Sequence, residues 1–149
     1  METFGSIIDK LCIIERRIKE LKSKGKPYYF LYEQQGWLIK GLGDYIAESF
    51  MGERPFTFKK NKLYDEGINV EEDQSLLEYI FKLKQYNDKL WDLEDIRRNK
   101  EVPDIERLKV CDQVSEYNKL RNDSIDMIDS TVLKAAKSSH LEKENEGDI

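Results

Sequence analysis

The fold of this chain is decided by one stretch of sequence, Leu76-Leu-Glu-Tyr-Ile80-Phe-Lys-Leu83-Lys-Gln-Tyr-Asn87-Asp-Lys-Leu90-Trp91-Asp-Leu-Glu94. Spacings of three and four residues alternate along it, which is the pattern of one side of an α-helix. The seam that this pattern defines is Leu76, Ile80, Leu83, Asn87, Leu90 and Glu94. Two polar residues, Asn87 and Glu94, therefore occupy positions that face the core of a helical bundle.

Helical patterns also occupy much of the remaining chain. A first helix, capped by Thr3, should end near Ser23–Gly25, before Pro27, and a second runs from Tyr28 to Met51. The quoted helix begins after Asp73 or Ser75 and continues to about Asn99. A fourth begins at Pro103 and loses its periodicity after about Ser130. One face of it carries Leu108, Cys111, Val114, Asn118, Arg121, Ile125 and Ile128. The predicted fold is all-α, an antiparallel bundle of about four helices with a long loop between the second and third.

Length and composition fit that prediction. A chain of 149 residues with 37% charged residues and three prolines is typical of one soluble helical domain. We expect the domain to span residues 1–133 and residues 134–149 to form a polar, frayed tail. The net charge of −5 argues against a general nucleic-acid binder. The sequence has no apolar run long enough for a membrane span and no secretory leader, which favours a cytoplasmic protein.

Residues 52–74 lack a helical period and carry a basic cluster that includes Lys59 and Lys60. Such a loop is uncommonly long for a compact domain. It either folds over an anionic ligand or forms an ordered loop pinned by its aromatic residues. Another aromatic group opens the second helix, where we expect it to supply core contacts and the surface of a homodimer. Its members are Tyr28, Tyr29, Phe30, Tyr32 and Trp37.

Polar residues on the third and fourth helices predict a polar layer inside the bundle. Asn87 and Glu94 lie two turns apart with Trp91 between them, and Asn118 shares a face with Arg121. An isolated buried carboxylate is unfavourable, so we expect Glu94 to pair with Arg121. The four residues then either satisfy one another and fix helix register, or face a cavity. In a cavity, Arg121 would bind a phosphate or carboxylate while Trp91 stacks on a ring.

The chain offers few groups for catalysis or metal binding. Cys12 and Cys111 are expected to be buried free thiols of a reducing compartment, and His140 is the sole histidine, which excludes histidine-based zinc sites. Carboxylates could hold Mg²⁺ between helices. The candidates are Glu94, Asp95, Asp123, Asp126 and Asp129. Such a site would resemble the all-α nucleoside triphosphate pyrophosphatases, whose paired Glu-x-x-Glu and Glu-x-x-Asp motifs do not occur here in matched form.

The polar motifs resemble small helical families of unknown function from bacteria and phages, whose genes often lie beside glycosyltransferase genes. The resemblance rests on Ile8-Asp9-Lys10-Leu11-Cys-Ile13, on Asn87-x-x-Leu90-Trp91-x-x-Glu94-Asp95 with Arg98, and on Asn118-x-x-Arg121-Asn-Asp123 with Ile128. It covers roughly residues 5–22 and 80–133, and residues 27–74 look like an insertion. The resemblance implies no known activity.

The sequence thus favours non-catalytic binding of a small anionic, nucleotide-like molecule, without a cofactor, by a homo-oligomer. In a phage such a protein could sequester a host signal. The candidate ligand contacts are Asn87, Trp91, Glu94, Asn118, Arg121, Arg16, Lys59 and Lys60. Arg16 and Asp9 flank the apolar stripe of the first helix and are expected to be exposed. The alternatives are an Mg²⁺-dependent nucleotide pyrophosphohydrolase using Glu94, Asp95 and Asp123, and a structural or protein-interaction module.

Overall fold

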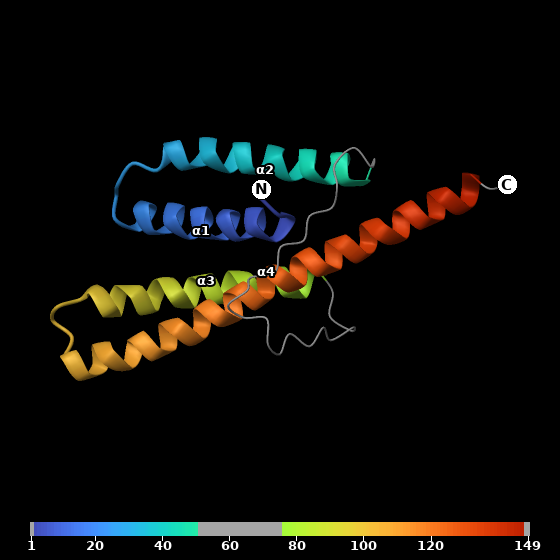
Figure 1. The fold of residues 1–149 in the computed structure, drawn as a ribbon. Coiled ribbons are helices and arrows are strands. Elements are labelled where there is room, and N and C mark those ends of the chain that lie inside the picture. The colour runs from blue at the N-terminus through green and yellow to red at the C-terminus, as the bar shows by residue number, and fades with distance from the viewer. Residues whose placement is uncertain (1, 51–75, 148–149) are drawn as a thin grey trace.

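The computed structural model describes residues 2–50 and 76–147, and these residues form four α-helices. The helices are α1 (Phe4–Ser23), α2 (Tyr29–Phe50), α3 (Leu76–Arg98) and α4 (Asp104–Gly147). They pair as two antiparallel hairpins, α1 with α2 and α3 with α4 (Figure 1). The all-α prediction is confirmed. The whole of the predicted loop, residues 52–74 with Lys59 and Lys60, lies outside the described residues.

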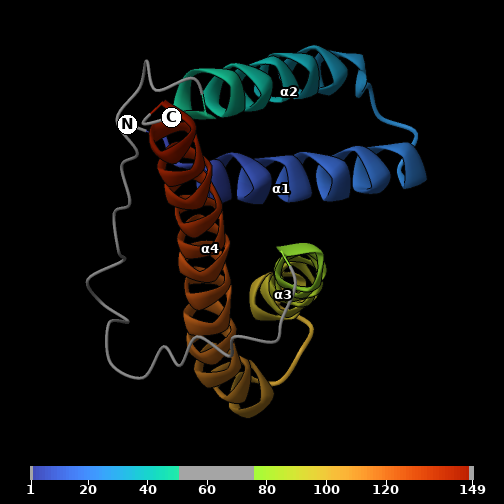
Figure 2. The ribbon, with the colours of Figure 1, turned by 90° about the vertical axis from the view of Figure 1, so that its right-hand side faces the viewer.

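The two hairpins cross obliquely. In Figure 1, α1 lies between α2 and α3; after the quarter turn of Figure 2, α3 is seen almost end-on while α1 and α2 still run across the view. Both α1 and α4 contact all three other helices. The junction between the hairpins is therefore formed by α1 against α3 and α4, and the polar site lies there.

Local sequence signals set most of the helix ends. Thr3 caps α1 in a capping box, with its Oγ1 accepting from the Ser6 backbone N–H at 3.2 Å while the Ser6 Oγ accepts from the Thr3 N–H at 2.9 Å. The Thr3 cap predicted from the sequence is confirmed. After α1 the chain turns through Gly25, whose φ of 64° favours glycine. Pro103 directly precedes α4, as its missing N–H allows.

The last helix is longer than its sequence pattern predicts. We expected periodicity to fade after about Ser130 and a polar tail to begin at 134, but α4 continues as one helix to Gly147. Val132 and Ala136 are buried in this extension. Val132 belongs to the same core cluster as Phe4 at the start of α1, a contact that no local sequence pattern specifies. No helix in the described ranges is long and apolar enough to cross a membrane.

The N-terminus of α1 is fixed to α4 by a close backbone approach. A Cβ on Gly5 would lie only 2.6 Å from the Ile125 carbonyl oxygen, so this contact requires glycine. The Gly5 N–H donates to Asp129 Oδ1 at 2.6 Å, which places a carboxylate at the positive end of the helix dipole. Burial raises the pKa of Asp129, and hydrogen bonds from Thr3 and Gly5 oppose that rise. Within residues 2–50 and 76–147, the buried Asp129 Oδ2 has no hydrogen-bond partner.

Candidate ligand-binding pocket

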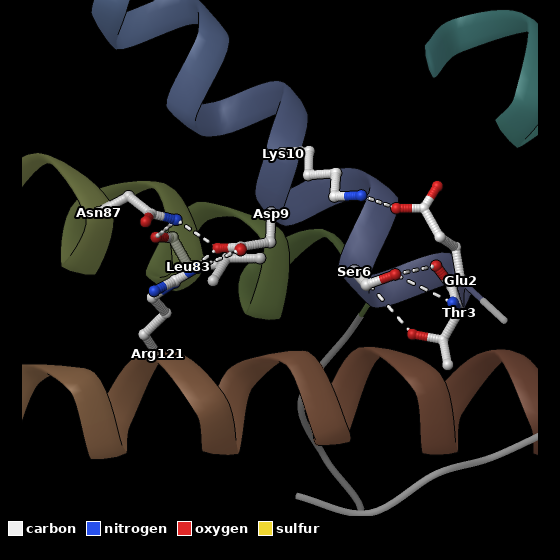
Figure 3. A network of polar contacts seen from close by, with 8 residues as sticks. All are labelled: Glu2, Thr3, Ser6, Asp9, Lys10, Leu83, Asn87 and Arg121. Carbon is white, nitrogen blue, oxygen red and sulfur yellow. Dashed lines mark hydrogen bonds and ion pairs between the residues drawn. The ribbon is translucent and has the colours of Figure 1, made fainter.

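A buried carboxylate on α1 joins α3 to α4. Asp9, which is only 5% exposed, accepts two hydrogen bonds from Arg121, Nε to Oδ1 at 2.9 Å and Nη2 to Oδ2 at 2.5 Å (Figure 3). Asn87 Nδ2 donates to the same Oδ1 at 2.8 Å and also to the Leu83 carbonyl at 3.2 Å. The two hydrogen bonds between Arg121 and Asp9 form the two-pronged geometry in which arginine binds carboxylates most strongly. Three helices are thereby held together at one polar point.

This arrangement corrects two predictions. Asp9 was expected to be exposed but is buried, and Arg121 was expected to pair with Glu94 but pairs with Asp9. Glu94 instead binds Arg97 at 2.7 Å and lies 3.7 Å from Arg98, both on its own helix. Those two cations follow Glu94 by three and four residues, which is the spacing of neighbours on a helix surface. Glu94 thus has local partners, and Arg121 is left to the carboxylate supplied by α1.

The ion pair keeps Arg121 charged. Its hydrogen bonds to Asp9 raise the pKa of the guanidinium, the charge of Asp9 adds to that rise, and partial burial opposes it. Arg121 retains 28% side-chain exposure, whereas the Asp9 side chain retains 7%. The open side of Arg121 therefore meets solvent in the neighbouring pocket, while Asp9 depends on protein partners.

Next to the ion pair is a pocket of about 330 Å³ between α1, α3 and α4. This volume lies at the small end of the range for ligand sites. Six of the eight predicted contacts line it, since the sequence-derived group and the lining share Arg16, Asn87, Trp91, Glu94, Asn118 and Arg121. The remaining lining residues are Ile13, Leu90, Asp95 and Arg98. The other two predicted contacts, Lys59 and Lys60, lie outside the described residues.

The pocket lining has mixed charge with an excess of cations. It contains three arginines, at 16, 98 and 121, and two carboxylates, at 94 and 95. Arg16 binds Asp92 at 2.8 Å and lies 3.7 Å from Asp88, yet its Nε is buried and has no hydrogen-bond partner among the described residues. Arg98 is the most accessible of the three cations, with 77% side-chain exposure. The donors still open to an incoming group are thus those of Arg98 and the outer side of Arg121.

Known proteins offer one comparison. Residues 77–147 match a family described as "Protein of unknown function (DUF4254)". The match covers slightly less than half of the chain and comprises nearly all of α3 together with α4. It contains Asn87, Trp91, Glu94, Asn118 and Arg121. The resemblance to an uncharacterised family is confirmed for this segment, and α1 and α2 lie outside it. No curated protein and no solved structure matches the chain.

The DUF4254-like hairpin supplies most of the pocket, and α1 completes it with residues that the sequence interpretation undervalued. Gly5, Asp9, Cys12 and Arg16 follow one another at spacings of four, three and four residues, so they form a second stripe on α1. The apolar stripe, with Ile14 and Ile18, packs on α2, whereas this small and polar stripe meets α3 and α4. Its helical spacing was the signal that could have identified Asp9.

The carboxylates considered for Mg²⁺ do not gather at one point. Among the described residues, no group of three or more His, Cys, Asp or Glu side chains could hold a metal ion. Asp129 caps α1, and Asp126 is buried. Burial raises the pKa of Asp123, and that residue does not line the pocket. Glu94 and Asp95 do line it.

The two thiols differ in environment. Cys12 is half-buried beside the polar junction, and burial, followed by the nearby charges of Asp9 and Glu15, raises its pKa to about 11. Cys111 was expected to be buried but is exposed near the start of α4. A thiol with so high a pKa is almost wholly protonated at neutral pH, so Cys12 is a poor nucleophile.

Proposed function

We propose that the pocket binds a small organic anion, nucleotide-like in carrying an acidic group and a flat ring, and releases it unchanged. The observation that carries this proposal is the convergence of three arginines and the half-buried Trp91 on one pocket of about 330 Å³. The acidic group would bind Arg98 and the open side of Arg121, because guanidinium groups match phosphate and carboxylate geometry. The ring would stack on Trp91.

Two polar groups of the pocket lining support the proposal that a ligand binds there. Asn118 lines the pocket without a hydrogen bond of its own within the described residues, so its amide is free to read donors and acceptors of a ring. The unpartnered Arg16 Nε is the second such group. A network built only to fix register would be expected to satisfy these atoms internally, as it does those of Asp9 and Asn87.

The inner and outer halves of the polar layer then have different roles. Asp9, Asn87 and the inner side of Arg121 satisfy one another, which supports a structural role for them. Arg98 and Trp91 take no part in that network and are the residues to mutate when binding is measured. The exposed aromatic residues at the start of α2 support the further proposal of a homodimer, since Tyr29 and Phe30 are 76% and 48% exposed.

Isothermal titration of the whole protein with a panel of nucleoside mono-, di- and triphosphates tests the proposal. We expect at least one member to bind and Arg98→Ala to weaken it about tenfold or more, the usual effect of losing a charge-assisted hydrogen bond. The matched control is Arg97→Ala, which removes the adjacent cation that pairs with Glu94 but does not line the pocket. Mass spectrometry of the supernatant after denaturation would identify a ligand that copurifies.

The same panel separates the alternatives. Incubation with Mg²⁺ followed by chromatography should return the nucleotide intact. Turnover would instead show that the protein is a hydrolase that uses Glu94 and Asp95. If the protein is only a structural module, no panel member and no copurified metabolite should bind. Arg121→Ala should then lower the stability of the protein without changing any binding. Equal loss of binding in Arg97→Ala and Arg98→Ala would refute the assignment of the pocket.

A further inference from the structure

A second hollow lies on the other side of α1. It has a volume of about 450 Å³ and is lined by Lys10, Ile13, Ile14, Gln34, Trp37 and Leu38, so it runs between α1 and α2. Ile13 lines this hollow and the charged pocket alike. In Figure 1, α1 lies between α2 on one side and α3 on the other. The lining residues place one hollow between α1 and α2 and the other where α1 meets α3 and α4. Ile13 is the residue that separates them.

The two hollows differ in chemistry. Four of the six residues that line the second one are Ile, Leu or Trp, and its single cation, Lys10, is already paired with Glu2 (Figure 3). Trp37 is 71% exposed at its edge. The charged pocket presents three arginines within reach of the same Ile13 side chain. An arginine-rich pocket and an apolar groove thus meet at one half-buried isoleucine, Ile13.

We propose that the ligand of the charged pocket carries an apolar chain, and that this chain crosses Ile13 into the groove between α1 and α2. This inference rests on the proposed function, because the acidic head is the group bound by Arg98 and Arg121. The ligand class is an anionic amphiphile, a phosphate or carboxylate with an alkyl or aryl extension. The shared Ile13 favours one ligand over two, since a chain in the groove removes apolar surface from water at the point where the head is held.

Alkyl phosphates of increasing length are suitable probes. Inorganic phosphate, butyl phosphate and octyl phosphate share a head and differ only in the chain, and octyl phosphate is used below its micelle concentration. The affinity should rise roughly threefold for each methylene that enters the groove. Octanol, which has the chain without the head, should bind much more weakly than octyl phosphate.

The two tryptophans of the sequence report on the two hollows separately. Trp91 lines the charged pocket and Trp37 lines the groove. In Trp37→Phe the remaining fluorescence comes from Trp91, and in Trp91→Phe it comes from Trp37. Inorganic phosphate should change only the Trp91 signal, whereas octyl phosphate should change the tryptophan signal of both variants, each with the dissociation constant that calorimetry gives for that same variant. A tryptophan signal whose constant differs from the calorimetric constant of the same variant would overturn the single-ligand inference.

A pair of variants isolates the groove. Trp37→Ala should abolish the dependence on chain length and leave phosphate binding unchanged, and the variant should fold because the Trp37 side chain lies largely in solvent. The matched control is Ile39→Ala, an exposed apolar residue of α2 that does not line the groove and should keep the full dependence. The titrations are run at two protein concentrations. If a second copy of the chain occupies the groove, the affinity for octyl phosphate will fall as the protein concentration rises, and this result would overturn the inference.

The outcomes distinguish this inference from the function on which it rests. If nucleotides or phosphate bind at Trp91 but the alkyl chain does not increase the affinity, the groove is not part of the binding site. The proposal for the charged pocket is then still supported. Equal affinity for octanol and octyl phosphate refutes both, because the head is then not recognised. A steady gain with chain length that is lost in Trp37→Ala supports both.

Discussion

Replacing Arg121 by Met should destabilise the protein far more than replacing its partner Asp9 by Leu. The first substitution removes two of the three side-chain hydrogen bonds to Asp9 and its counter-ion, while that carboxylate remains 5% exposed. Removing one partner of a buried ion pair costs about 3–5 kcal/mol. The Asn87 hydrogen bond at 2.8 Å remains but does not neutralise the charge.

The reverse substitution leaves a cation with access to water. Arg121 keeps 28% side-chain exposure and lines the pocket, so solvent can replace the lost carboxylate. We therefore expect Asp9→Leu to cost about 1–2 kcal/mol, the range for a partly solvated polar group that loses its partner. The double variant, with an apolar pair in the same place, should lie within about 1 kcal/mol of the native protein. The coupling energy between the two positions is then about 3–7 kcal/mol.

Urea denaturation followed by far-ultraviolet circular dichroism measures all four proteins. The free energy of unfolding is compared only if the slope against urea concentration is the same for each, so that two-state behaviour holds. Equal losses in the two single variants would refute the asymmetry argued from exposure. A double variant whose loss equals the sum of the single losses would show that Asp9 and Arg121 do not act as a pair.

Two further predictions concern the contact of α1 with α4. Gly5→Ala should destabilise the protein by about 1–3 kcal/mol in urea denaturation, because the new methyl group meets the Ile125 carbonyl oxygen. Gly36→Ala, on a helix with open space at that position, should instead stabilise it by up to about 1 kcal/mol, and equal effects would contradict the close approach. Burial raises the pKa of Asp129 above its ordinary 3.8, so the native state favours the protonated acid. The stability contributed by Asp129 is full below pH 3.8 and is lost as the pH rises through the higher native pKa. Asp129→Asn should therefore match the native protein in acid and exceed its stability at neutral pH, as thermal unfolding across pH will measure; a constant difference at every pH would contradict it.

Much of the fold could be predicted because its determinants are local. Thr3 supplies a cap within three residues of its partner Ser6, and Gly25 and Pro103 mark ends through their own backbone properties. The seam of α3 was equally readable, and its Leu83, Asn87 and Leu90 are buried. The length of α4 was not predictable, because Val132, beyond the predicted end of the periodicity, packs in the same cluster as Phe4 at the distant start of α1.

The candidate site likewise has one part that local sequence spacing predicts and one part that depends on distant contacts. Spacing along α3 and α4 placed Asn87, Trp91, Asn118 and Arg121 on facing surfaces, and they line one pocket. The partner of Arg121 could not be chosen by spacing along those two helices, since Glu94 and Asp9 both offered a carboxylate. Glu94 had two cations on its own helix, whereas Asp9 is presented from α1 by the oblique packing of the hairpins.

The sequence by itself determined that this protein is helical and that polar side chains enter its core, because helical periodicity and capping act over a few residues. Only the tertiary structure decided that Asp9 closes the polar layer and that Ile13 stands between a charged pocket and an apolar groove. Those relations depend on how α1 crosses α3 and α4. That crossing is selected by the approach of Gly5 to Ile125 and by ion pairing across more than one hundred residues of chain, whereas sequence periodicity describes each helix alone.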